Sequence, residues 1–290
     1  MEIECVAPAG ALLGEGTLWD PERGRVWWVD IRGPAMHSHE VASGLNQVQP
    51  LDFRITALGL AQDGRLVAAG DPGFLTLAVD ADFKVRVEAV IARPEEPTGN
   101  RFNDGKVDAA GRFWAGTMDD AEQSARGTLY RLDAQGLHRV RERIAVPNGP
   151  CFLADGTMLA ADTARRVVHA FTLDASGDPV AERTFASFDA SQGYPDGMTT
   201  DAEDHVWIAF WDGGCLRRLD PRGEIVREVP LPVQRPTCPV FAGPRLDQLY
   251  VTSAATGLDA EALRRQPWAG GLLRLDVGVG GRPPPRFSAC

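Results

Sequence analysis

The sequence contains no long apolar run, no paired cysteines and no excess of positive charge. No stretch approaches the roughly twenty apolar residues that cross a bilayer, and the start, MEIECVAPAG, lacks the basic and apolar segments of a signal peptide. The formal net charge of -10 argues against a nucleic-acid partner. We therefore expect a cytoplasmic protein, a monomer or weak homo-oligomer, with neither a nucleic-acid nor a membrane partner.

Several motifs of catalytic and cofactor sites are also missing. The five cysteines are scattered without a CxxC pair, which indicates neither a disulfide framework nor a thiolate zinc site. No GxSxG motif is present, and no Cys and His can be paired, so nucleophilic catalysis by serine or cysteine has no support. The glycines at Gly14 and Gly16 lack the further glycine and the helix of a phosphate-binding loop.

What the chain does have is many turns and a repeat. It contains 31 Gly and 21 Pro, and a turn followed by a hydrophobic strand occurs six times, most clearly within Asn100 to Asp120. The turn residues are 40, 47, 45, 48 and 43 positions apart: Gly24, Gly64, Gly111, Gly156, Asp204 and Asp247. This is the spacing of four-stranded propeller blades, whereas a β-helix or sandwich would show a shorter period or no repeated turn. We predict an all-β, six-bladed β-propeller of antiparallel blades that forms one domain over residues 1–290.

Two details of the ring follow from the ends of the repeat. The proline-rich tail GRPPPRFSAC is a poor outer strand for the last blade, because proline breaks a hydrogen-bonded ladder. We therefore predict that Glu2 to Val6 supplies that strand and closes the ring. One short helix is expected over Asp259 to Gln266, behind an Asp cap. The tryptophans on the repeat strands are expected to pack within the blades.

Oxygen-bearing side chains recur at one position of the repeat. That position lies eight residues before each turn residue, or nine in the first copy, and it is occupied by Glu15, Thr56, Asn103, Asn148, Asp196 and Pro239. Equivalent positions of a propeller lie at equal radius, and these precede the strands that line the central channel. We therefore expect Glu15, Asn148, Asp196 and, as a further donor, Asn103 to meet at one end of the axis.

Such a set of hard oxygen donors suits one divalent cation. Ca²⁺ is the first choice, with Zn²⁺, Mn²⁺, Mg²⁺ and Fe²⁺ as alternatives. The competing interpretation is that the Asn-Gly and Asp-Gly pairs are ordinary turn dipeptides. Their recurrence at one repeat position favours the metal site.

Other polar residues near the repeat position also have both a functional and a structural interpretation. Arg101 is interpreted as a hydrogen-bond donor that faces the pocket rather than as a surface charge. Asp119 and Asp120 either border the same mouth or form a solvated acidic turn, and the second interpretation is preferred for Asp119. The five histidines fall on outer or second strands, which favours structural or solvent-facing roles over metal ligation.

The motifs together resemble the SMP-30/gluconolactonase family, also called regucalcin-like. The resemblance runs nearly end to end and is carried by LGEGTLWD, NRFNDGKVDAAGRFWAGTM, PNG, YPDGM and VTSAATGLDAEALRRQPWAGGLLRL. It implies a six-bladed propeller that holds one divalent metal and hydrolyses sugar lactones to aldonic acids. By motif, Glu15, Asn148 and Asp196 match the metal ligands, Arg101 and Asn103 match substrate-holding positions, and Asp196 also matches the catalytic carboxylate.

One departure from the family pattern concerns the substrate pocket. In vertebrate members GTM is followed by an Ala-Glu-Glu that contributes to the pocket, whereas this chain has Asp119, Asp120 and Ala121. Asp120 is therefore a candidate substrate-binding residue whose contacts with sugar hydroxyls are expected to differ.

The expected chemistry is hydrolysis of a sugar lactone. The cation polarises the lactone carbonyl, and Asp196 acts as general base for the attacking water. Two alternatives stay open: a metal-dependent hydrolase that resembles phosphotriesterases, and a calcium-binding regulatory propeller without catalysis.

Overall fold

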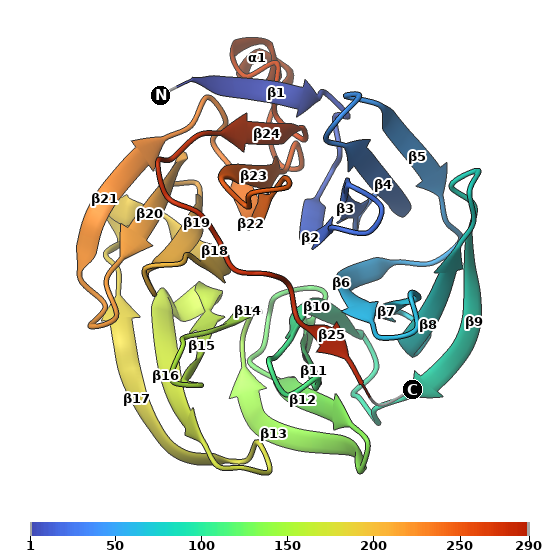
Figure 1. The fold of residues 1–290 in the computed structure, drawn as a ribbon. Coiled ribbons are helices and arrows are strands. Elements are labelled where there is room, and N and C mark those ends of the chain that lie inside the picture. Colours follow the sequence, from blue (N-terminus) through green and yellow to red (C-terminus); the bar gives the residue numbers. More distant parts are fainter. Residues whose placement is uncertain (1, 289–290) are drawn as a thin grey trace.

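Residues 2–288, which the computed structural model describes, form a ring of six β-sheets around a central channel (Figure 1). Within each blade the strands follow one another outward from the channel, and neighbouring strands are antiparallel. This confirms the six-bladed propeller predicted from the repeat. No helix among the described residues is long and apolar enough to span a membrane.

Four concentric sets of strands make up the blades. The inner strands are β2 (Gly14–Asp20), β6 (Ile55–Ala61), β10 (Asn100–Val107), β14 (Pro147–Phe152), β18 (Tyr194–Thr200) and β22 (Pro236–Ala242). The second strands are β3 (Arg25–Asp30), β7 (Leu66–Gly70), β11 (Phe113–Asp119), β15 (Met158–Asp162), β19 (Val206–Trp211) and β23 (Gln248–Ser253). The third strands are β4 (Ala35–Glu40), β8 (Gly73–Val79), β12 (Gly127–Asp133), β16 (Val167–Leu173), β20 (Cys215–Leu219) and β24 (Leu272–Leu275).

The outer strands include one from the start of the chain. They are β5 (Asn46–Pro50), β9 (Val85–Ala92), β13 (Gly136–Ile144), β17 (Pro179–Ser187), β21 (Ile225–Pro230) and β1 (Ile3–Ala7). Because β1 pairs antiparallel with β24, the amino-terminal segment completes the last blade, as predicted. The ring is thus closed by hydrogen bonds between the two ends of the chain.

The turn between the inner and second strands is built in the same way in most blades. Five of the six predicted turn residues adopt left-handed backbone angles: Gly24, Gly64, Gly111, Gly156 and Asp204. In the last blade Leu246, one residue before the predicted Asp247, takes this conformation. The repeat therefore marks the turns correctly to within one residue.

Buried aspartates tie these turns to the tryptophans of the second strands. The indole Nε1 of Trp114 donates to Asp108 Oδ2 at 2.8 Å, and that of Trp207 donates to Asp201 Oδ2 at 3.0 Å. Asp108 also accepts main-chain hydrogen bonds from Ala110 and Arg112 in its own turn. These tryptophans are fully buried, so their predicted packing role is confirmed.

Three short helices and a tail strand complete the part of the chain that the structure describes. The α-helix α1 (Ala260–Arg265) starts at Asp259, whose carboxylate accepts from the Ala262 amide, as predicted from the Asp cap. The 3-10 helices are η1 (Thr163–Arg165) and η2 (Ala190–Gln192). The proline-rich tail forms no outer strand, but its residues β25 (Arg286–Phe287) pair in parallel with β6 on the far side of the ring. Figure 1 shows the tail crossing the channel to reach that blade.

The four cysteines within residues 2–288 are packing residues rather than ligands or cross-links. Cys151, Cys215 and Cys238 are buried with free thiols, and Cys5 is partly buried. Burial raises the pKa of the Cys151 thiol to about 12, which keeps it protonated at neutral pH. Cys290 lies outside the described residues.

Candidate active site

The predicted ligand positions fall where the inner strands begin and where their pairing is irregular. Glu15, Asn103, Asn148 and Asp196 lie on β2, β10, β14 and β18, beside or within a register shift in each strand. A bulge turns side chains out of the regular alternation of a strand. It therefore allows these four polar side chains to face one another at the end of the channel.

All four side chains line one cavity of about 480 Å³, which we call the site cavity. Arg101 lines it as well, and all five residues are buried, with at most 9% of their surface exposed. The convergence expected from the repeat is therefore present: residues from four blades meet in one concave space. Their roles as ligands, catalyst and substrate contacts stay predictions.

Two carboxylates in this cavity are short of hydrogen-bond donors. Burial raises the pKa of Glu15 well above its usual range, and the charges of Asp196 and Asp104 raise it further. Burial also raises the pKa of Asp196 well above its usual range, with the charge of Asp104 as the next cause. Glu15 accepts one hydrogen bond, from the Gly16 amide at 3.2 Å, and Asp196 accepts from the Gly197 amide.

This arrangement suits a divalent cation. Uncompensated carboxylates in a buried cavity are costly unless protons or a cation neutralise them. No group of three or more His, Cys, Asp or Glu side chains within residues 2–288 is arranged for metal binding. A cation held here would therefore need amide oxygen as well as the two carboxylates, which fits Ca²⁺ better than metals that prefer nitrogen or sulfur.

The two amides are linked to each other. Asn103 Nδ2 donates to Asn148 Oδ1 at 3.0 Å and to the Pro147 carbonyl at 2.9 Å. Asn148 Nδ2 donates to Thr163 Oγ1 at 2.9 Å. The Asn148 side chain, which lines the cavity, is consequently fixed by hydrogen bonds at both ends of its amide, and Asn103 supplies one of these bonds.

Asp104, next to Asn103 in the sequence, is an additional buried carboxylate of this region and is not among the residues that line the cavity. Its two oxygens accept from the Gly105 amide at 2.7 Å and the Gly149 amide at 2.8 Å. Gly149 directly follows Asn148, so Asp104 ties the bulge of β10 to the bulge of β14. Both Asn103 and Asp104 belong to the NRFND motif, and the sequence alone did not show that Asn103 lines the cavity while Asp104 supports the main chain.

Arg101 and Asp120 form a pair whose second member lies outside the lining of the cavity. Arg101 Nε donates to Asp120 Oδ1 at 2.6 Å, and Arg101 Nη1 donates to Asn103 Oδ1 at 2.8 Å. Asp120 also accepts from Arg54 Nη1 at 2.8 Å. The structure therefore places Asp120 as a support for Arg101, and its direct contact with substrate stays a prediction.

Asp119 is not a solvated acidic residue, contrary to the preferred interpretation of the sequence. Its side chain is buried and accepts from Ser124 Oγ at 2.9 Å and Arg126 Nη2 at 2.8 Å. The bonds to Ser124 and Arg126 lower the pKa of this carboxyl to about 2. Asp119 organises the loop that follows β11 and does not line the site cavity.

Several residues of the cavity wall were not identified from the sequence. Arg32, Trp211, Asp212 and Arg235 all line it. Arg235 Nε donates to Asp212 Oδ1 at 2.7 Å, and its guanidinium lies 4.8 Å from the centre of the Trp211 ring. Most of these residues follow second strands, which return antiparallel to the inner strands and so end at the same mouth.

Comparison with known proteins identifies relatives that match nearly the whole chain. The family model described as "SMP-30/Gluconolactonase/LRE-like region" matches residues 13–255. The pentonolactonase XacC of Haloferax volcanii is 34% identical over 98% of this chain and 97% of its own length. Human regucalcin is 34% identical over 98% of this chain and 97% of its own length.

A solved structure agrees with the fold. The crystal structure of a calcium-binding protein, regucalcin, from Agrobacterium tumefaciens superimposes with a TM-score of 0.91 at 32% identity, covering 98% of this chain and 96% of that one. With the sequence matches above, this shows that the chain belongs to the SMP-30/gluconolactonase/LRE-like family.

Proposed function

We propose that this protein hydrolyses a sugar lactone to the corresponding aldonic acid with one divalent cation held by Glu15, Asn148 and Asp196. The observation that carries the proposal is the pair of buried carboxylates, poor in donors, that share one cavity with an oriented amide oxygen. The name of the Haloferax relative, a pentonolactonase, supports the substrate class. We propose Ca²⁺ first, because the donors are all oxygen and the Agrobacterium relative is described as calcium-binding.

Each chain residue has a defined task in the proposed reaction. Asp196 accepts a proton from the water that attacks the lactone carbonyl carbon, and returns it to the ring oxygen as the ester C–O bond breaks. Arg101 uses Nε and Nη1 in bonds to protein, which leaves Nη2 for a lactone oxygen. Asn103 holds the oxygen of Asn148 in place. The bound cation supplies Lewis-acid polarisation of the carbonyl.

The site cavity is also suited to a substrate with several hydroxyl groups. Its wall combines the charged side chains of Arg32, Glu122 and Asp212 with the aromatic side chains of Tyr194 and Trp211. Sugars need hydrogen-bond partners around the ring and an apolar face to pack against. Both are present within about 480 Å³.

Acid release from a panel of aldonolactones tests the proposal. We expect turnover of at least one pentono- or hexonolactone, loss of that turnover after chelation, and recovery on adding back Ca²⁺, Zn²⁺, Mn²⁺, Mg²⁺ or Fe²⁺. A phosphotriester assayed in parallel separates the two hydrolase classes. Turnover of the phosphotriester alone, or cation binding without turnover of either substrate, would overturn the lactonase assignment.

A further inference from the structure

A second cavity, of about 410 Å³, occupies the opposite end of the channel, and we call it the tail cavity. Its walls come from later residues of the same inner strands whose first residues line the site cavity, such as Leu18 of β2, Lys106 of β10 and Cys151 of β14. None of the residues that line the tail cavity also lines the site cavity. The two cavities are therefore separate binding spaces.

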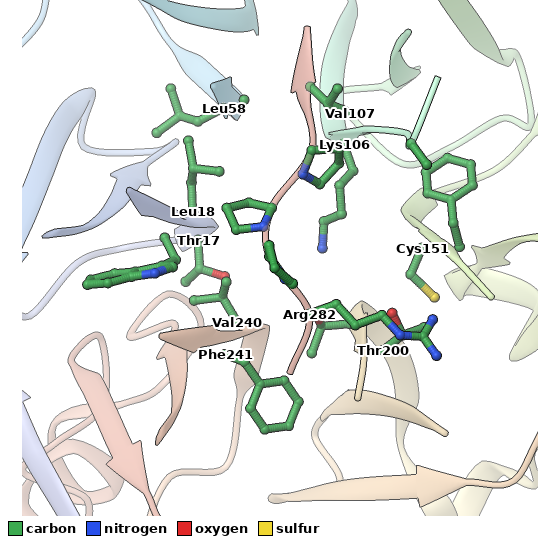
Figure 2. Close-up of a pocket in the computed structure, with 18 of the residues that line it drawn as sticks. Thr17, Leu18, Leu58, Lys106, Val107, Cys151, Thr200, Val240, Phe241 and Arg282 are labelled. Carbon is green, nitrogen blue, oxygen red and sulfur yellow. The ribbon is translucent and has the colours of Figure 1, made fainter. Parts of the chain in front are cut away.

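The carboxyl-terminal tail forms one wall of this cavity. Pro283, Pro284 and Pro285 line it where the tail crosses the channel (Figures 1 and 2). On one side the tail is held by the Gly281 amide, which donates to the Leu246 carbonyl at 2.7 Å. On the other side the pairing of β25 with β6 holds it. The cavity is thus a built part of the fold.

The wall is mostly apolar and contains no carboxylate. Leu18, Leu58, Val107 and Phe241 contribute side chains, and no Asp or Glu is among the described residues that line the cavity. Its two cationic groups are Lys106 and Arg282. A space with apolar walls and a positive group favours a ligand that has an apolar body and one negative group.

The two cations differ in their partners. Arg282 Nη2 donates to Asp204 Oδ1 at 2.9 Å, which neutralises it. Lys106 Nζ donates to the Met198 carbonyl at 2.8 Å, and within residues 2–288 no carboxylate lies within ion-pair distance of it. Burial raises the pKa of Asp104 and the positive charge of Lys106 opposes that change, but both oxygens of that carboxylate already accept hydrogen bonds from main-chain amides.

Lys106 is placed to meet a ligand in this space. Figure 2 shows its side chain reaching into the middle of the cavity, with Leu18 and Leu58 on one side and Cys151 on the other. An ammonium group has three donors, and one is used. Two N–H groups remain for an anion.

We propose that the tail cavity binds a small monocarboxylate with a hydrocarbon body. Its carboxylate pairs with the Lys106 ammonium, and its hydrocarbon chain packs against Leu18, Leu58 and Phe241. A neutral analogue loses the charge-assisted hydrogen bond, and an amine is repelled by Lys106. This proposal does not depend on the lactonase assignment, because it uses none of the residues of the site cavity.

The sequence offers an unusually direct test. Lys106 and Lys84 are the two lysines of the chain, and Lys84 is an exposed residue of the β8–β9 turn. Lysine labelled with ¹⁵N at the side chain therefore gives two assignable NMR signals in the full-length protein. We expect octanoate to shift the Lys106 signal and leave the Lys84 signal in place, both in metal-loaded protein and after chelation.

Calorimetry with the same protein measures the chemistry of recognition. Octanoate should bind more tightly than hexanoate by about fourfold per methylene group, and octanol and octylamine should bind at least about tenfold more weakly than octanoate. Lys106→Met should weaken octanoate binding by about tenfold, and Lys84→Met, the matched control, should not change it.

Three outcomes would overturn the proposal. The first is octanoate binding that disappears on chelation and is unchanged in Lys106→Met, which would place the carboxylate at the metal site. The second is equal affinity for octanoate, octanol and octylamine. The third is the absence of any shift in the Lys106 signal of the wild-type protein, a readout that does not depend on the folding of a variant.

Discussion

The guanidinium of Arg101 and the carboxylate of Asp120 form an ion pair, with 2.6 Å between Nε and Oδ1, in which the arginine is buried and the aspartate half-exposed. Burial lowers the pKa of Arg101, and the hydrogen bond to Asp120 opposes that change. The aspartate thus keeps a buried arginine charged and fixed beside the proposed cation site.

Replacing Asp120 should therefore affect substrate binding without removing the cation. We expect Asp120→Asn to lower kcat/KM for the preferred lactone by about tenfold, mainly through KM, because Arg101 loses its charged partner. Steady-state kinetics and metal titration measure the two effects. Asp71→Asn is the matched control, since Asp71 pairs with Arg54 as Asp120 does, but within residues 2–288 it forms no hydrogen bond or ion pair with Arg101. A loss of metal affinity in Asp120→Asn would contradict this role.

Two isosteric substitutions separate the proposed role of Asp196 as a base from the role in metal binding that it is proposed to share with Glu15. Asp196→Asn should lower kcat by about 10² to 10⁴ even when metal is saturating, because the acceptor of the water proton is gone. Glu15→Gln should weaken metal binding, and excess metal should restore most of its turnover. Wild-type turnover by Asp196→Asn with metal bound would show that Asp196 is not the base.

The lowered pKa of His37 leads us to predict that the folded protein is less stable in acid. Its ring stacks on Trp28 with 3.9 Å between ring centres, and burial lowers its pKa to about 4 from an ordinary value near 6.5. Between these two pH values the unfolded chain binds a proton that the folded chain does not. The contribution of neutral His37 to the free energy of unfolding is therefore complete above about pH 6.5 and is lost as the pH falls toward 4.

Urea unfolding at pH 7.5 and pH 4.5 checks this effect. Because the His37 ring is only partly buried, we expect its titration to account for a loss on the order of 2 kcal/mol between the two pH values. His37→Phe, which keeps a stacked ring, should lose correspondingly less stability in acid than the wild type. Parallel behaviour of the two proteins would assign the acid sensitivity to other groups.

The burial of Phe287 leads us to predict that the tail contributes to the stability of the ring. Its side chain is fully buried against Phe113 of the neighbouring blade, with 6.4 Å between the ring centres. Phe287→Ala should lower the free energy of unfolding by about 3 to 5 kcal/mol through lost burial and the cavity left behind. Val48→Ala, at an exposed position of β5, should change it little. Denaturation midpoints measure both effects. An unchanged midpoint in Phe287→Ala would show that the tail does not stabilise the ring.

The repeat predicted the ring because the physical cause of the fold is local. Each turn needs a left-handed residue, and each strand needs apolar residues, so Gly111 or Gly156 can be recognised with no knowledge of the other blades. The convergence of Glu15 and Asp196 followed from symmetry alone. Even the shift of the last turn to Leu246 changes no candidate ligand.

Other features depended on contacts that the repeat does not encode. The hydrogen bond between Asp120 and Arg101 depends on the path of a loop. The crossing of the tail depends on the pairing of β25 with β6 and on the burial of Phe287. The wall residues Trp211 and Asp212 could have been found, because Trp211 ends a repeat strand and Asp212 directly follows it. In each blade the second strand runs antiparallel to the inner strand, so it ends at the same end of the channel at which the inner strand begins.

The inner strands have a consequence for the adaptation of this enzyme family member to new substrates. In β14 Asn148 faces one cavity, and Cys151, three residues later, faces the other; in β2 Glu15 and Leu18 are related in the same way. We therefore expect a change of side-chain volume at Cys151 or Leu18 to shift the backbone that carries a proposed ligand, while the ligand itself is preserved. Laboratory evolution can in this way adjust the proposed site from the opposite end of the channel.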